Sequence, residues 1–130
     1  MQKAVLIIAA LYGATAVIFG AFGAHALKDR LESASLTAWQ TAVQYQFYHA
    51  LALLLLGLLM FHMPSRSLTV ASIAMALGTA LFSGSLYLLA TRSLLPLGEL
   101  RFLGPITPLG GLTLIIGWIA LLVAAIKLRS

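Results

Sequence analysis

The chain has 130 residues, of which 62% are hydrophobic and only 8% are charged. A soluble domain carries about 25% charged residues, and a small one leaves much of its surface in water. The composition therefore excludes an ordinary soluble domain, a disordered chain and a nucleic-acid-binding protein, and predicts a single membrane-embedded domain spanning residues 1–130. The formal net charge of +5 comes from Lys and Arg at the ends of apolar runs, where helices face anionic lipid headgroups. Because the chain has no cysteine, disulfides, thiolate metal sites and Cys nucleophiles are excluded.

Four apolar runs follow one another, at about residues 4–26, 37–61, 68–90 and 105–126. Each is long enough to cross a hydrocarbon core of about 30 Å as a helix. Backbone groups in lipid must be paired within the protein, so we expect an all-α, antiparallel bundle of four transmembrane helices. The first run has a basic start at Lys3 and ends near an A-x-A-like sequence, but it is longer than the core of a signal peptide, and we expect it to be retained.

The charged residues between the runs bear on topology. Four spans place both termini on one side of the membrane, and the Lys and Arg residues divide equally between the two sides. Acidic residues, all on the side away from the termini, contribute little to orientation. The terminal amine and the pair Lys127 and Arg129 favour cytoplasmic termini, so we expect a multi-pass protein of the bacterial inner membrane.

Small residues recur at helical spacing in three of the runs. Such stripes allow helix backbones to approach closely in lipid. They would serve packing within the bundle or contact between copies of the chain, and we expect a homo-oligomer in contact with membrane lipids. The stripes are Ala9, Gly13, Ala16, Gly20 and Ala24; Ala76, Ala80 and Gly84; and Gly110, Gly117 and Ala124.

Polar residues inside the spans gather in one half of the membrane. Alternating helix directions bring the end of the first run, the start of the second, the second half of the third and the start of the fourth to the side away from the termini. At 1.5 Å per residue, His49 lies about 15 Å along its helix from Trp39, near the bilayer middle. A polar residue at that depth needs a partner or water and is a candidate functional residue. The candidates are His49, Gln46, Tyr45, Ser83, Ser85, Tyr87, His25 and Thr107.

These residues fit a structural role as well as a site. Membrane Ser and Thr often bond to carbonyls of their own helix, and a neutral His can be satisfied by one partner across an interface. No acidic residue lies within a span, which disfavours proton-coupled export. Two histidines on different helices are a weak metal signal, and no Ser–His pair has an orienting acid. We therefore predict no catalytic residue, no metal site and no cofactor, and do not expect an enzyme.

Four motifs in order, GAFGAH, YQFYH, FSGSLY and TPLGG before a Gly-Trp pair, resemble the domain-of-unknown-function family 423 of small bacterial inner-membrane proteins. The resemblance runs from Gly20 to Trp118 and implies a four-helix membrane protein without an established function. It carries over no catalytic residue.

Two functions are compatible with these features. In the first, the chain binds or passes a small molecule, ion or lipid at a polar pocket in the half away from the termini, with Thr107 at its mouth. In the second, it is a structural or accessory subunit of a larger membrane complex.

Overall fold

The computed structural model describes residues 1–95 and 102–128, and that part of the chain forms four helices without strands. They are α1 (Gln2–His25), α2 (Ser33–His62), α3 (Arg66–Ala90) and α4 (Leu103–Ile126). All four are long and apolar enough to cross a membrane, which confirms the predicted all-α class. Their ends differ from the predicted ends by at most four residues, the largest difference being the start of α2.

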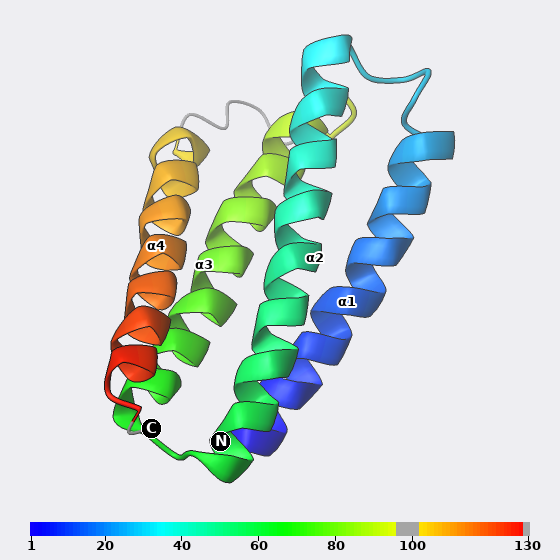
Figure 1. Ribbon diagram of the computed structural model, residues 1–130. Coiled ribbons are helices and arrows are strands. Elements are labelled where there is room, and N and C mark those ends of the chain that lie inside the picture. Colours follow the sequence, from blue (N-terminus) through cyan, green and yellow to red (C-terminus); the bar gives the residue numbers. More distant parts are fainter. Residues whose placement is uncertain (96–101, 129–130) are drawn as a thin grey trace.

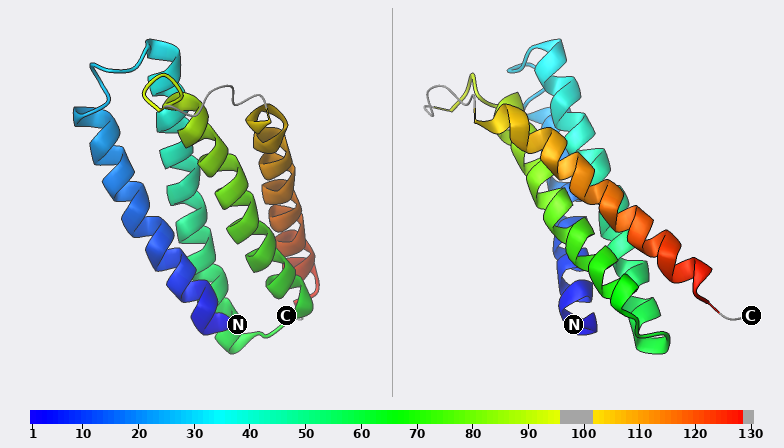
Figure 2. Two further views of the ribbon diagram at one scale, coloured as in Figure 1. Left: turned by 180° about the vertical axis from the view of Figure 1, so that it is seen from behind. Right: turned by 90° about the vertical axis from the view of Figure 1, so that its left-hand side faces the viewer.

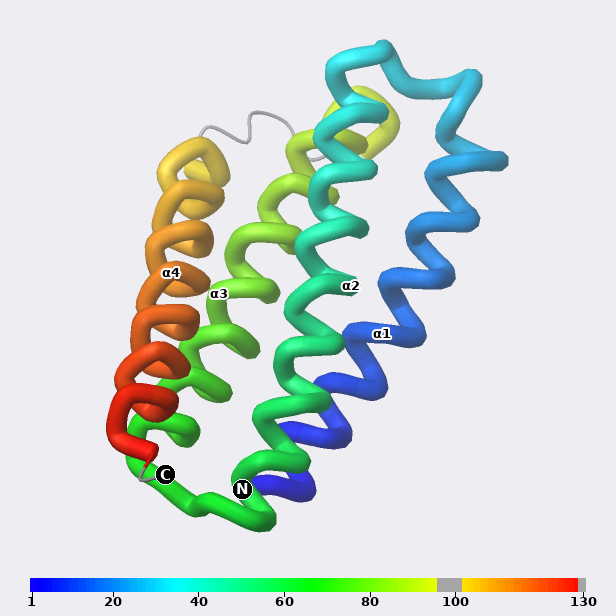
Figure 3. Tube along the Cα trace, viewed as in Figure 1, coloured from blue at the N-terminus to red at the C-terminus, as the bar shows by residue number. Residues whose placement is uncertain are grey.

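The helices run antiparallel in an up-and-down arrangement (Figure 1). We call the end that holds the start of α1, the α2–α3 turn and the end of α4 the terminal end, and the other end the distal end (Figure 2). The Cα trace shows the start of α1 and the end of α4 at the same end of the bundle (Figure 3). Ser65 caps α3 there, because its hydroxyl accepts a hydrogen bond from the Leu68 amide at 3.1 Å.

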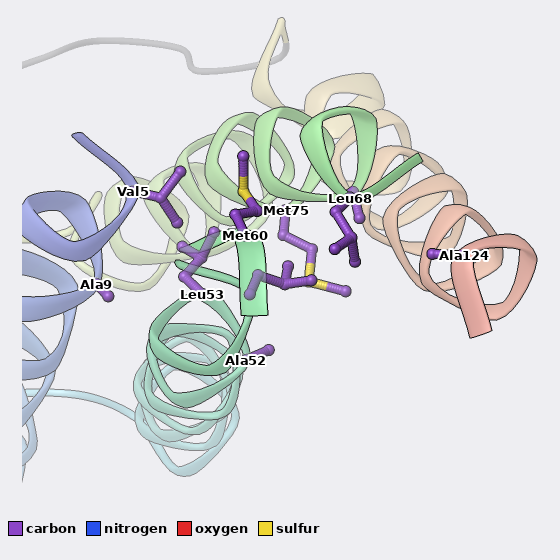
Figure 4. Packing of buried hydrophobic residues seen from close by; sticks show 10 residues of the cluster. Val5, Ala9, Ala52, Leu53, Met60, Leu68, Met75 and Ala124 are labelled. Carbon is purple, nitrogen blue, oxygen red and sulfur yellow. The ribbon is translucent and has the colours of Figure 1, made fainter. Parts of the chain in front are cut away.

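The pair α2 and α3 forms the centre of the bundle, and α1 and α4 lie on its two sides (Figure 4). In the most apolar window of α2 and of α3, 39% of the residues are buried, against 17% in α1 and α4. The outer helices therefore present most of their surface to lipid. Such exposure is favourable only inside a membrane, because lipid tails are as apolar as the side chains that face them.

An apolar core fills the terminal half between the four helices. It is built around Leu53, Leu56 and Met75, each at most 1% exposed, with Val5 from α1 and Ala124 from α4 at its sides. Figure 4 shows Leu53 and Met75 between α2 and α3, with Val5 on the α1 side and Ala124 on the α4 side.

Close contact of α3 and α4 depends on small residues of α4. A Cβ atom at Gly110 would meet the backbone of Phe82, and one at Gly117 would lie 2.7 Å from Cγ of Met75. The predicted stripe on α4 is therefore a packing surface within the chain. On α3 only Ala76 of the predicted stripe packs against the core: Ala80 is exposed and nothing lies within 4 Å of a Cβ at Gly84, because α4 packs against a different face. Along α1 the stripe packs up to Gly20, but Ala24 is exposed and Gly23 replaces it against Trp39.

Candidate functional site

Gln46, near the middle of α2, joins three helices through its amide. Its side chain is 5% exposed. The Nε2 group donates to the Tyr12 carbonyl at 2.9 Å and to Oγ1 of Thr15 at 2.6 Å, and Oε1 accepts from the Tyr87 hydroxyl at 2.6 Å. Thr15 in turn donates to the carbonyl of Leu11 at 2.8 Å. Both ends of the amide are engaged by α1 and α3, so the buried group is satisfied by protein atoms.

Two further hydroxyls bind backbone carbonyls across helix interfaces. Tyr12 of α1 donates to the Ala76 carbonyl of α3 at 2.8 Å, and Ser83 of α3 donates to the Ala42 carbonyl of α2 at 2.8 Å. A helix carbonyl can accept a second hydrogen bond without losing its helical one. These bonds therefore tie neighbouring helices in register without breaking either of them.

An aromatic cluster closes the distal end above Gln46. The indole of Trp39 donates to the Phe19 carbonyl at 2.8 Å, and its ring centroid lies 4.7 Å from that of Tyr87. Phe19 meets Trp39 and Tyr87 edge to face, at 5.7 and 5.0 Å. Edge-to-face pairs are the favourable arrangement of aromatic rings. Leu27 and Leu31 of the α1–α2 connection are buried in the same cluster.

His49 lies about one helical turn beyond Gln46 on α2 and contacts α4. It is 4% exposed. Its Nδ1 lies 2.7 Å from the carbonyl oxygen of Tyr45, and the Trp118 indole donates to Nε2 at 3.0 Å. A carbonyl only accepts and an indole N–H only donates, so both bonds together require a neutral imidazole with its proton on Nδ1. Both ring nitrogens are thus occupied.

A third polar contact joins the distal ends of α3 and α4. The hydroxyls of Ser85 and Thr107 lie 2.6 Å apart, and Ser85 donates to the Phe82 carbonyl at 3.0 Å. Thr107 is therefore the donor in the pair, because the single hydroxyl proton of Ser85 is already used.

The predicted site residues divide among these contacts rather than lining one surface. The structure brings Gln46 to Tyr87 and Ser85 to Thr107, whereas His49 faces another helix. Tyr45 is 40% exposed and contributes its backbone carbonyl to His49.

The remaining candidate, His25, is exposed at the end of α1, away from these contacts.

Three partners were not among the predicted site residues. Tyr12 and Thr15 interrupt the apolar first run at a spacing of three, which places them on one helix face. This spacing is the sequence feature that could have identified Tyr12 and Thr15 as polar partners. Trp118 belongs to a quoted motif, but nothing in the sequence indicates that its indole meets His49.

Thr79 differs from the polar residues described above, which are hydrogen-bonded inside the bundle. Its side chain is 2% exposed and its hydroxyl is a buried polar atom without a hydrogen-bond partner. It lies one helical turn from Ser83 on α3, at the centre of the bundle.

Metal ligands do not gather in the described residues, where no group of three or more His, Cys, Asp or Glu side chains occurs. Four hollows between the helices have mainly aliphatic linings, and none of these four is lined by His49, Gln46, Ser83 or Ser85.

Comparison with known proteins shows which family this chain resembles. Residues 19–111 match the family described as "Protein of unknown function (DUF423)". The chain is 42% identical to a UPF0382 membrane protein of Staphylococcus epidermidis and to the UPF0382 membrane protein YwdK of Bacillus subtilis, in each case over 97% of this chain and 98% of the relative. It is also 42% identical to the UPF0382 inner membrane protein YgdD of Escherichia coli K12, over 98% of this chain and 93% of the relative. No solved structure gives a significant match. The chain is a multi-pass membrane protein and belongs to the DUF423 family.

Proposed function

We propose that the protein is an accessory membrane protein that acts by associating with other membrane proteins, including further copies of itself. The observation that carries this proposal is that the buried polar side chains form their hydrogen bonds with other atoms of the bundle. Gln46 and His49 use every side-chain nitrogen and oxygen for bonds inside the bundle. A group in that state holds helices together and does not offer a free contact to a ligand.

The surface that we assign to association is the distal part of α2 beside α1. Gln44 and Tyr48 are exposed there, at a depth where most of the surface is apolar. They border a groove whose floor includes the small residues Ala16, Gly20 and Ala21. A second copy suits this surface, because two amides related by a two-fold axis can each donate to and accept from the other.

The test is the oligomeric state of the protein in lipid nanodiscs or mild detergent. The variant Gln44→Leu combined with Ala21→Trp removes the amide and fills the groove, and it should shift the protein to monomer. Leu112→Trp, on the exposed face of α4, is the matched control and should leave the assembly unchanged. A wild-type monomer that also recovers no partner from its native membrane would contradict the proposal.

A second candidate function is binding of a small molecule or ion at the polar half, and Thr79 favours it. An unpartnered hydroxyl in the bundle centre can accept a water or a polar ligand group. The Trp118 ring, 47% exposed, covers His49, and its displacement would open Nε2. A lipid-embedded experimental structure tests this candidate: a ligand or ordered water bound to Thr79 or His49 supports it, and dry contacts contradict it.

We further propose that the protein resides in the bacterial inner membrane with cytoplasmic termini. The terminal amine and the closely spaced pair Lys127 and Arg129 support this orientation, because the two sides carry equal numbers of Lys and Arg and the count alone favours neither side. A C-terminal fusion to a fluorescent reporter that matures only in the cytoplasm should be bright. A matched fusion to a periplasm-dependent phosphatase should be inactive, and the opposite pattern would overturn the orientation.

A further inference from the structure

We infer that the terminal end carries a binding site for an anionic phospholipid, in a cavity between α2, α3 and α4. This site is separate from the polar half and from the association surface proposed above.

The cavity has a volume of about 300 Å³ and is lined by the end of α2, the α2–α3 turn, the start of α3 and the end of α4. Its lining is apolar over most of its area, with Leu59, Leu68, Leu121 and Ala125 among the contributing residues. The apolar lining fits a hydrocarbon chain. Its position at the ends of membrane-spanning helices fits a chain that continues to a headgroup at the membrane surface.

The mouth of the cavity is polar and basic. Lys127 and Ser65 are the polar residues in its lining, and both are exposed. Ser65 is also the N-cap of α3, so the positive end of a 25-residue helix dipole lies beside the cavity. An ammonium group and a helix N-terminus both favour a phosphate, while the apolar walls accept the acyl chain.

The charge distribution along the chain selects an anionic headgroup. The terminal end carries Lys3, Arg66 and Lys127, whereas all three acidic residues of the chain belong to the segments that connect α1 with α2 and α3 with α4. A zwitterionic headgroup brings a cation into this basic environment, and an anionic one does not. Basic pockets between membrane helices are known binding sites for anionic lipids.

The experiment offers the full chain equal amounts of two phospholipids with the same oleoyl chains, one with a phosphatidylglycerol and one with a phosphatidylcholine headgroup. Native mass spectrometry then counts the lipids that stay bound after extraction. We expect about five-fold preference for phosphatidylglycerol, the factor that corresponds to one basic residue near the surface. The variant Lys127→Gln should remove most of this preference. Its control, Lys3→Gln, removes the same charge from α1 at the same end and should keep the preference.

A second set of three variants tests the cavity itself. Ala125→Phe fills it and should reduce retention of both lipids, with Ala125→Leu giving an intermediate loss. Ala14→Phe, at an exposed alanine on α1 outside the cavity lining, should reduce neither. Equal retention of the two lipids by the wild type would overturn the proposal. So would an equal loss of preference in Lys3→Gln and Lys127→Gln, because the selectivity would then belong to the whole basic surface.

Discussion

The two halves of the bundle are held together by different interactions. In the terminal half, Leu53, Leu56 and Met75 pack at van der Waals distance, and the polar contacts between helices are few. Around the middle of the bundle and in the distal half, directional hydrogen bonds from Gln46, Ser83 and other polar side chains connect all four helices.

The difference shows how apolar packing and hydrogen bonds each determine the arrangement of helices in lipid. Lipid tails compete well with apolar side chains, so apolar packing in a membrane depends on close fit more than on a hydrophobic driving force. A hydrogen bond fixes which residue of one helix lies beside which residue of the next. We therefore expect stability losses that follow side-chain volume in the terminal half and hydrogen-bond count in the distal half.

The largest effect is expected at Leu53 in the terminal half. Its side chain is 0% exposed, and Leu53→Ala should lower the free energy of unfolding by about 2–5 kcal/mol because it leaves a cavity. Reversible unfolding in mixed micelles measures the loss. Leu55→Ala on the same helix, at a side chain 62% exposed, is the control and should cost little. Equal losses would show that packing in this half is loose.

The next effect is expected at Gly110, where α4 touches α3. Gly110→Ala places a methyl group against the Phe82 backbone, which cannot move aside as a side chain can, and should cost about 1–3 kcal/mol. Thermal melting in detergent measures the change. Gly84→Ala, where a Cβ meets nothing within 4 Å, is the matched control. If both variants melt at the wild-type temperature, the close contact of α3 and α4 is not required.

A smaller effect is expected at Gln46 in the distal half. Gln46→Leu keeps the volume but removes two donated bonds and one accepted bond, and should cost about 1–2 kcal/mol. The same unfolding measurement applies, with the exposed Gln40 changed to Leu as the control. A gain in stability in Gln46→Leu would contradict the role of the amide in joining the helices.

The smallest effect is expected at Ser83. Ser83→Ala removes one bond to the Ala42 carbonyl and should cost about 0.6 kcal/mol, the average for a side-chain hydrogen bond in a membrane protein. Thr113→Val removes a bond that stays within α4 and should change stability less. A larger loss of unfolding free energy in Thr113→Val than in Ser83→Ala would show that bonds between helices do not stabilise the protein more than bonds within one helix.

The four helices could be predicted from the sequence because each apolar run has the length of a membrane span. Their starts were less accurate. Helix α2 begins at Ser33, in more polar sequence before the apolar run, and hydropathy does not indicate a helix there.

The pairing of the polar side chains could not be predicted. Alternating helix directions correctly bring Gln46, Ser83 and Tyr87 to one half, because direction and rise fix depth. Which side of a helix meets which neighbour depends on packing. His49 and Gln46 are three residues apart, yet they contact α4 and α1 respectively. Bonds to backbone carbonyls, such as that from Tyr12, leave no trace in the sequence of the accepting residue.

The nitrogen-15 NMR spectrum of His49 in the lipid-embedded protein tests the account most directly. We predict a single neutral tautomer with the proton on Nδ1, and a Trp118 indole proton shifted by its bond to Nε2. The variant Trp118→Phe removes the donor and should move the Nε2 resonance of His49 while leaving the backbone fold unchanged. A proton on Nε2, or exchange between tautomers, would contradict the claim that the buried polar side chains are engaged with one another.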